Sequence, residues 1–308
     1  MKLIAPERYL DFHCIAGACR HSCCIGWEID IDPESLHRFE QVPGPLGKRL
    51  RQNIDTDGET ACFRLQGQEE RCPFLNQHGL CDLIIELGED ALCQICTDHP
   101  RFRSFYADRT EIGLGLCCEA AGKLLLGAEE PMRLIMLGDD GASEPTDPEE
   151  QELLALRDSL FELMQNRSIP IALRVDQLLS VSQVDWQDWA DFLLTLERLD
   201  EHWAELIKQL PHAFVQPLDS WLEVPLEQLI CCLLYRHLPG ALEDGDISGR
   251  IRFCALMWHM IARLCAQNAC MSLDDLVELT RLYSSEIEYS NENTCAILDR
   301  IAQAYEGR

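Results

Sequence analysis

The chain has 308 residues, with 26 Lys and Arg against 53 Asp and Glu, and its formal net charge at pH 7 is −27. Such an acidic chain offers no basic stripe to nucleic-acid phosphates, so we expect no nucleic-acid partner. No apolar run approaches the roughly 20 residues of a membrane span, and the first residues lack the apolar segment of a signal peptide. We therefore expect a cytoplasmic protein with no membrane partner.

Cysteine is unusually frequent and unevenly distributed. Of the 17 cysteines, eleven lie in residues 1–118. In a chain without an export signal they are expected to be thiols or metal ligands, and not a disulfide framework. The other six lie in apolar, helical surroundings, where most are expected to be buried as small hydrophobic side chains. They are Cys231, Cys232, Cys254, Cys265, Cys270 and Cys295.

The first half of the chain predicts short, irregular elements. Residues 10–13 and 27–32 are predicted to be extended, the second because apolar and acidic residues alternate. Asp32 and Pro33 predict a helix start, and residues 47–54 predict another helix. The turn composition of residues 76–79 predicts a hairpin or loop that brings Cys72 and Cys81 together. Helical spacing over 89–96 predicts that Cys93 and Cys96 lie one turn apart on one face.

The second half predicts helices almost throughout. Residues 138–150 have the Gly, Asp and Pro content of a linker. Helices are predicted within 151–164, 171–182, 186–210, 218–238, 247–269 and 273–305, the last broken near 284–293. The predicted fold is mainly α. An irregular, cysteine-rich, metal-binding N-terminal domain with few short strands (1–137) is followed by the linker and an all-helical C-terminal domain (151–308).

The cysteine spacing predicts a metal site. Thiolates bind soft or borderline metals such as zinc, copper(I) and the iron of sulfide clusters. A zinc ribbon needs two C-x2-C pairs, and only Cys93 and Cys96 have that spacing. Iron–sulfur clusters accept irregular spacing. We therefore expect a cysteine-ligated iron–sulfur site, with zinc as the alternative metal.

Four cysteine motifs and two later segments together resemble one family. The motifs are Cys14-x4-Cys19-x3-Cys23-Cys24-x2-Trp27, Cys72-Pro-Phe-Leu-x4-Leu-Cys81, Cys96-x2-His99-Pro100-Arg101 and Cys117-x-Glu119-Ala120-Ala121, and the later segments are residues 234–240 and 283–293. They resemble the flagellin lysine-N-methylase family (FliB). The resemblance implies a cytoplasmic protein lysine N-methyltransferase that uses S-adenosylmethionine (SAM), carries a [4Fe–4S] cluster and acts on flagellin.

The resemblance also implies a set of metal ligands. Carried over by position, the family pattern falls on Cys14, Cys19, Cys23, Cys24, Cys72, Cys81, Cys96 and Cys117. Cys62, Cys93 and Cys118 are additional cysteines, and Cys118 stands where the family pattern leads us to expect proline. The residues do not reveal which four cysteines ligate a cluster.

Methyl transfer to lysine needs a neutral amine held in line with the methyl group, and a nearby carboxylate or tyrosine can help to remove its proton. Tyr283, Glu286 and Tyr289 are the catalytic candidates, and Glu286 and Tyr289 are spaced to share a helix face. The alternative is a solvated polar helix end.

No ordinary SAM-binding motif is present, because Gly113-Leu-Gly115 lacks the third glycine. An open iron of the cluster would replace such a motif by holding the amino and carboxylate groups of SAM. The candidates for binding this cofactor are Arg101, Arg236 and Asn293.

Two other functions remain open from the residues alone. The chain could be a non-enzymatic zinc- or iron-binding protein whose metal only folds the cysteine-rich domain. It could instead be a redox-sensing protein that uses its surplus thiols.

Overall fold

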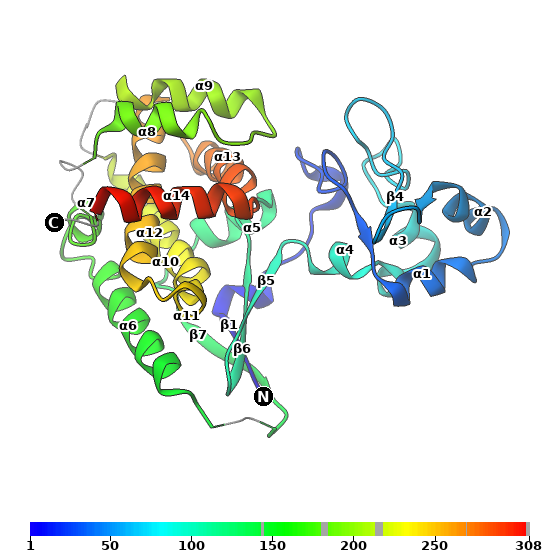
Figure 1. Cartoon of the computed structure of the whole chain (residues 1–308), viewed down its shortest axis with the longest axis horizontal. Coiled ribbons are helices and arrows are strands. Elements are labelled where there is room, and N and C mark those ends of the chain that lie inside the picture. Colours follow the sequence, from blue (N-terminus) through cyan, green and yellow to red (C-terminus); the bar gives the residue numbers. More distant parts are fainter. Residues whose placement is uncertain (143–144, 180–183, 213–217, 269, 306–308) are drawn as a thin grey trace. The chain divides into compact units, whose positions relative to one another are not determined.

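A computed structural model describes residues 1–142, 145–179, 184–212, 218–268 and 270–305. The chain divides into two compact units (Figure 1). The cysteine-rich unit is His13–Arg101, and the helical unit is Met1–Phe12 together with Phe102–Arg308. These bounds differ from the predicted ranges 1–137 and 151–308, because the first strand of the chain pairs with strands that follow residue 101.

A four-stranded sheet closes the helical unit. Its strands are β1 (Lys2–Pro6), β5 (Arg101–Phe105), β6 (Arg109–Leu114) and β7 (Leu134–Asp139), in the order β5-β6-β1-β7. Strand β1 is parallel to β6 and antiparallel to β7. The predicted linker therefore begins inside a strand, and its residues 143 and 144 lie outside the described part of the chain. Residues 10 and 11, predicted to be extended, belong to a 3-10 helix at Glu7–Asp11, which begins directly after the proline that ends β1.

The helices of this unit confirm the mainly α prediction. They are α5 (Glu119–Leu126), α6 (Pro148–Met164), α7 (Ile171–Val175), α8 (Trp186–Leu193), α9 (Glu201–Gln209), α10 (Glu223–His237), α11 (Ala241–Asp244), α12 (Ile247–Gln267), α13 (Leu273–Tyr283) and α14 (Asn291–Tyr305). The predicted break near 284–293 is a π-helix at Ser284–Glu288 followed by a new helix start. Residues 180–182 and Ala269 of two predicted helices lie outside the described residues.

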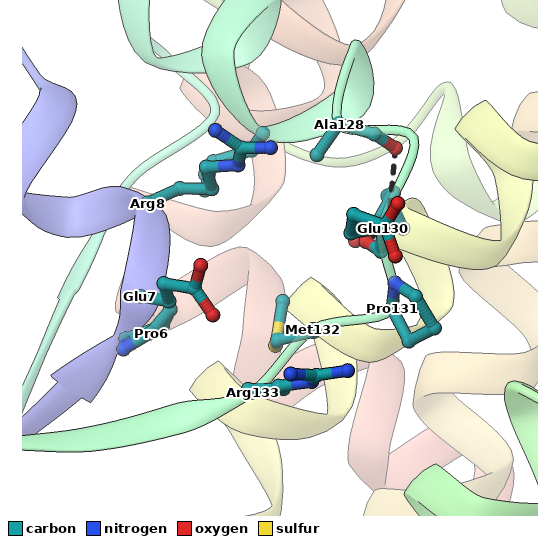
Figure 2. A pocket seen from close by; sticks show the side chains of 10 residues that line it. Pro6, Glu7, Arg8, Ala128, Glu130, Pro131, Met132 and Arg133 are labelled. Atoms are coloured by element: carbon teal, nitrogen blue, oxygen red, sulfur yellow. Dashed lines mark hydrogen bonds between the residues drawn. The ribbon is translucent and has the colours of Figure 1, made fainter.

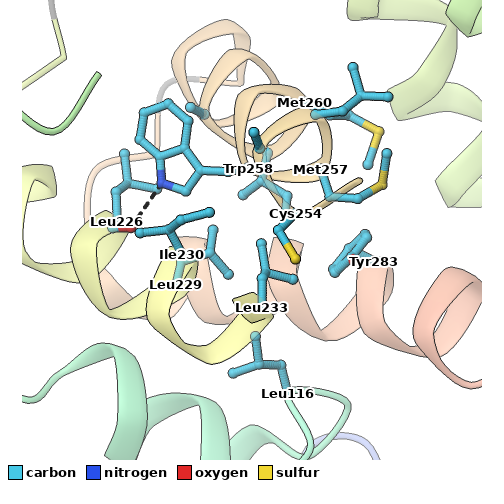
Figure 3. Close-up of a cluster of buried hydrophobic side chains, with 14 of the residues drawn as sticks. Leu116, Leu226, Leu229, Ile230, Leu233, Cys254, Met257, Trp258, Met260 and Tyr283 are labelled. Atoms are coloured by element: carbon cyan, nitrogen blue, oxygen red, sulfur yellow. Dashed lines mark hydrogen bonds between the residues drawn. The ribbon is translucent and has the colours of Figure 1, made fainter. Parts of the chain in front are cut away.

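The core of the helical unit lies between α10 and α12 (Figure 3). Leu229, Leu233, Met257 and other side chains drawn there are fully buried. The indole Nε1 of Trp258 donates to the Leu226 carbonyl oxygen at 2.8 Å, so the largest apolar side chain of α12 has its polar atom satisfied. Tyr283, the last residue of α13, belongs to the same cluster, directly before the π-helix.

Two buried ion pairs stiffen the same unit. Arg157 on α6 donates to both carboxylate oxygens of Glu111 on β6, at 2.5 and 3.1 Å. Arg174 on α7 donates to Glu227 on α10 at 2.8 Å. All four side chains are almost completely buried. Removing one partner of such a pair leaves an uncompensated buried charge.

The cysteine-rich unit has its own small core. Its elements are β2 (Asp30–Ile31), α1 (Pro33–Glu40), α2 (Gly44–Asn53), β3 (Ile54–Asp55), β4 (Ala61–Phe63), α3 (Asp82–Leu87) and α4 (Gln94–Asp98). The strands form an antiparallel sheet in the order β2-β4-β3. Asp32 caps α1 as predicted, since its Oδ1 accepts from the Ser35 amide at 2.9 Å. Phe39, Phe63 and Phe74 fill the centre.

None of the described helices combines the length and apolar character that crossing a membrane requires.

Candidate functional site

The hairpin that was predicted to bring Cys72 and Cys81 together is present. Leu75 and Cys81 form an isolated β-bridge, and the Asp82 amide donates to the Phe74 carbonyl oxygen at 2.8 Å. The Cys72 amide in turn donates to the Cys24 carbonyl oxygen at 2.8 Å. Backbone hydrogen bonds therefore hold the segments of these three cysteines next to one another.

Two further thiols join them from α4. Cys93 immediately precedes the helix and Cys96 lies within it, and their Sγ atoms are 3.3 Å apart in a hydrogen bond. The two thiols are one turn apart, as the sequence predicted. Cys93 was not among the ligands carried over from the family. Its C-x2-C spacing with Cys96 was the feature of the sequence that could have indicated it as a ligand.

The five thiols influence one another electrostatically. Burial is the main cause that raises the pKa of Cys72 to about 12, and the charges of Cys24, Cys81 and Cys93 contribute to this increase. The pKa of Cys96 is raised by its hydrogen bond to Cys93, by burial, and by the charges of Cys93, Cys24 and Cys72. A hydrogen bond from Cys23 lowers the pKa of Cys24 to about 7. We call Cys24, Cys72, Cys81, Cys93 and Cys96 the five-thiol group.

The five-thiol group has the donor chemistry of a soft-metal site. In the described residues, however, no three Cys, His, Asp or Glu side chains have the spacing that would hold a metal ion. The side chains present thus fit the chemistry of an iron–sulfur or zinc centre without forming its coordination geometry. A metal-binding domain is therefore not confirmed, and the cluster stays a prediction.

The remaining predicted ligands are placed differently. Cys14 and Cys23 are exposed, and the Cys19 thiol donates to the His21 carbonyl oxygen at 3.1 Å. Cys117 belongs to the helical unit, where it is hydrogen-bonded to Tyr289. Cys117 therefore has a polar partner that its sequence motif did not predict.

Tyr289 and Arg236 form a second cluster with Cys117, on the helical unit. The Cζ atom of Arg236 lies 4.8 Å from the ring centroid of Phe102 and 4.7 Å from that of Tyr289, so the guanidinium is held between two aromatic rings. Its Nη2 donates to the Glu288 carbonyl oxygen at 3.1 Å. Its Nη1 is buried and makes no hydrogen bond of normal geometry, although the Tyr289 hydroxyl is close enough to the guanidinium to raise the pKa of Arg236 by charge and by a hydrogen bond.

Glu288 is the buried carboxylate next to the Arg236 guanidinium. Its Oε1 accepts from His237 Nε2 at 2.8 Å and its Oε2 from the Ser284 hydroxyl at 2.5 Å, while Arg236 Nε is 3.8 Å from Oε1. Burial alone would raise the pKa of Glu288, but the charge of Arg236 and the hydrogen bond with His237 lower it to about 2. Burial lowers the pKa of His237, so a neutral imidazole donates to an ionised carboxylate.

The other predicted catalytic residues lie elsewhere in this unit. Tyr283 is fully buried, burial raises its pKa well above the usual range, and its hydroxyl has no hydrogen-bond partner among the described residues. Glu286 accepts from the amides of Leu199 and Asp200, at 3.0 and 2.7 Å, immediately before α9. The prediction that Glu286 and Tyr289 share a face is wrong, because the segment is a π-helix and Tyr289 lies beyond its end.

The two other predicted cofactor residues make local contacts. Asn293 donates through Nδ2 to the carbonyl oxygens of Glu286 and Glu197, at 2.7 and 3.0 Å. Arg101 donates to the Thr97 carbonyl oxygen at 3.0 Å. Of the three predicted cofactor residues, Arg236 is the one that has a buried donor left over.

Figure 2 shows a small pocket of the helical unit between the end of β1 and the segment after α5. Arg8, Glu130 and Arg133 are among its lining residues, and Gln228 closes it by donating to the carbonyl oxygens of Ala128 and Glu130. The pocket contains no predicted catalytic, cofactor or metal residue.

The chain is similar in sequence to curated proteins of Salmonella. Two are named Lysine-N-methylase, from Salmonella choleraesuis (strain SC-B67) and Salmonella typhimurium (strain LT2). Each is 26% identical over 162 residues, which are 49% of this chain and 40% of the relative. A third, Flagellar biosynthetic protein FliU of Salmonella muenchen, is 26% identical over 134 residues, 42% of this chain and 79% of the relative.

No protein-family model and no solved structure matches the chain. The resemblance predicted from the motifs is thus confirmed as sequence similarity over about half of the chain, which spans 40% of the length of the two lysine-N-methylases.

Proposed function

We propose that this chain is a SAM-dependent protein lysine N-methyltransferase that modifies flagellin and carries a cysteine-ligated [4Fe–4S] cluster. The observation that carries the proposal is the similarity to two proteins named Lysine-N-methylase and to a flagellar protein. The arrangement of side chains adds support at two places, the five-thiol group and the Arg236 cluster.

The five-thiol group supports the cluster through its chemistry. Cys24, Cys72, Cys81, Cys93 and Cys96 offer more thiolates than the four protein ligands that a fully ligated cluster takes. Backbone hydrogen bonds hold the segments of Cys24, Cys72 and Cys81 together, and the thiols of Cys93 and Cys96 are hydrogen-bonded to each other.

Arg236 supports the binding of a carboxylate. Its Nη1 is a buried donor without a hydrogen bond of normal geometry, and leaving such a donor unpaired costs on the order of 1–3 kcal/mol. The carboxylate of a bound SAM would remove that cost. Tyr289, which stacks on the guanidinium, is 47% exposed, so its movement would open Nη1 to a ligand.

In the proposed reaction SAM supplies a methyl group on a sulfonium sulfur. Both carboxylate oxygens of Glu288 are already hydrogen-bonded, so this carboxylate orients Arg236 and does not take up the lysine proton. Tyr289, which is partly exposed, is the candidate to accept a hydrogen bond from a neutral lysine amine. The chain thus acts mainly by positioning its two substrates.

The first experiment is metal analysis of protein purified without oxygen. A brown protein with broad absorbance near 400 nm and about four irons per chain supports the cluster. We expect Cys72→Ser to lose iron and the matched control Cys295→Ser, an exposed thiol of the helical unit, to retain it. A colourless protein with stoichiometric zinc would contradict the cluster and favour the structural alternative.

The second experiment measures SAM binding and methyl transfer to purified flagellin by mass spectrometry. We expect Arg236→Met to weaken SAM binding at least tenfold. Arg300→Met is the matched control, because Arg300 also lies over two aromatic rings, Trp189 and Phe192, away from this cluster. Equal affinities of the two variants would remove Arg236 from the proposal. If a protein that carries the cluster and binds SAM leaves flagellin unmethylated, the proposal that flagellin is the substrate is refuted.

A further inference from the structure

Cys265 and Cys270 differ from the other cysteines of the helical core. The sequence predicts most of these thiols to be buried, and Cys231, Cys254, Cys265 and Cys270 are. Cys265 and Cys270 are in addition hydrogen-bonded to each other through their side chains. Two thiols that are hydrogen-bonded to each other can do chemistry that an isolated buried thiol cannot.

The backbone holds the two thiols together. Cys265 lies in the last turn of α12, and the Cys270 amide donates to the Cys265 carbonyl oxygen at 3.0 Å. This hydrogen bond brings the two backbones together, as a disulfide between the two residues requires. The next helix begins with a capping box between Ser272 and Asp275.

We propose that Cys265 and Cys270 form a reversible disulfide when the protein meets a low-molecular-weight disulfide such as glutathione disulfide. The Cys270 sulfur attacks one sulfur of the oxidant, the oxidant's S–S bond breaks, and one thiol leaves. The Cys265 sulfur then attacks Cys270, releasing the second thiol and closing the bond. Two protein thiols are oxidised, one small disulfide is reduced to two thiols, and the two protons end on those thiols.

Accessibility gives the order of the two steps. Cys270 is 8% exposed and Cys265 is 1% exposed, so the oxidant reaches Cys270 first. The hydrogen bond from Cys265 also lowers the pKa of Cys270, which favours its thiolate, and raises that of Cys265. The new bond would join the end of α12 to the residues that begin α13, the helix that leads into Ser284–Glu288.

The test is peptide mass spectrometry on the full chain after exposure to graded ratios of oxidised to reduced glutathione under native conditions. Free thiols are alkylated before digestion with trypsin. Cleavage at Arg263 and Arg281 isolates both thiols in residues 264–281, which contain no other cysteine. We expect this peptide to escape alkylation and to lose two hydrogen atoms, reversibly on reduction.

The internal control is Cys254, which is equally buried and is the single cysteine of tryptic residues 253–263. It should remain alkylatable. We also expect Cys265→Ser to stop at a mixed disulfide between glutathione and Cys270, whereas Cys270→Ser should leave Cys265 unmodified. The proposal is overturned if residues 264–281 stay fully alkylated in oxidised, folded protein, or if Cys254 is oxidised to the same extent. Neither result depends on methyl transfer.

Discussion

Replacing Glu288 by glutamine tests how much the buried carboxylate beneath Arg236 contributes to folding. The substitution keeps the shape of the side chain and removes its charge. His237 and Ser284 keep a hydrogen-bonding neighbour, but Arg236 loses its buried counter-charge. The variant therefore isolates the electrostatic contribution.

The magnitude follows from the pKa. In the folded protein the pKa of Glu288 is about 2, against 4.5 for an unperturbed glutamate. A difference of about 2.5 pKa units corresponds to roughly 3 kcal/mol at pH 7. We expect Glu288→Gln to lower the free energy of unfolding by about that amount, in line with the ~3–5 kcal/mol for breaking a buried ion pair.

The sign of the pH dependence is fixed by the direction of the shift. Because the pKa of Glu288 is lower in the folded state, its stabilisation is complete above about pH 4.5 and is lost as the pH falls toward 2. The difference between the original protein and Glu288→Gln should therefore shrink over that interval.

Urea unfolding followed by tryptophan fluorescence suits this test, because five of the six tryptophans belong to the helical unit and only Trp27 to the other. The matched control is Glu278→Gln on α13, whose partly exposed pair with Arg281 should contribute less than about 0.5 kcal/mol. Equal losses in the two variants, or a difference that stays constant down to pH 3, would refute the reasoning.

Three other substitutions test the packing of the helical unit by the same urea assay. Leu233→Ala, at a fully buried position of α10, should cost about 2–5 kcal/mol through the cavity it leaves. Arg157→Met should cost about 3–5 kcal/mol, because Glu111 is left buried without its partner. Gly113→Ala would place a Cβ atom 2.4 Å from the Phe102 ring, so it should cost about 1–3 kcal/mol and also weaken SAM binding by displacing that ring from the Arg236 guanidinium.

Each of these substitutions has a matched surface control. Leu199→Ala removes a 70% exposed side chain, Arg8→Met removes an exposed pair with Asp11, and Gly138→Ala adds a Cβ with no atom within 4 Å. All three should change the free energy of unfolding by less than about 0.5 kcal/mol. A control that loses as much as its core counterpart would contradict the packing argument for that position.

The locally determined features were predictable from the sequence. The hairpin between Cys72 and Cys81 depends on four turn residues, and the start of α1 depends on Asp32 and Pro33. Interactions between residues close in the chain leave a readable pattern, because turn and cap chemistry is set by the residues themselves.

The sheet was missed because it depends on distant pairs. Leu3 lies opposite Thr110 in β6 and opposite Gly138 in β7. No local pattern joins five N-terminal residues to strands more than a hundred positions later, so the composition of residues 138–150 indicated a domain boundary inside what is one unit, whose last strand ends at Asp139.

In the candidate site, too, features set by nearby residues were easier to predict than contacts between distant residues. The segment 283–293 includes Tyr289, which contacts Arg236, but α-helical spacing misassigned the neighbours of Tyr289. In a π-helix the turn is wider than the 3.6 residues on which the pairing of i and i+3 depends. Glu288 and Phe102, which hold Arg236, became apparent only from contacts across the fold.

The discontinuity of the helical unit bears on how the chain folds during synthesis. Strand β1 emerges from the ribosome before its partner residues in β6 and β7, which begin at Arg109 and end at Asp139. Residues 13–101 have a separate core, and their strands β2, β3 and β4 pair with one another, so they can fold while β1 is still unpaired. The nascent chain must therefore keep a short apolar strand out of wrong pairings until more than a hundred further residues have been made.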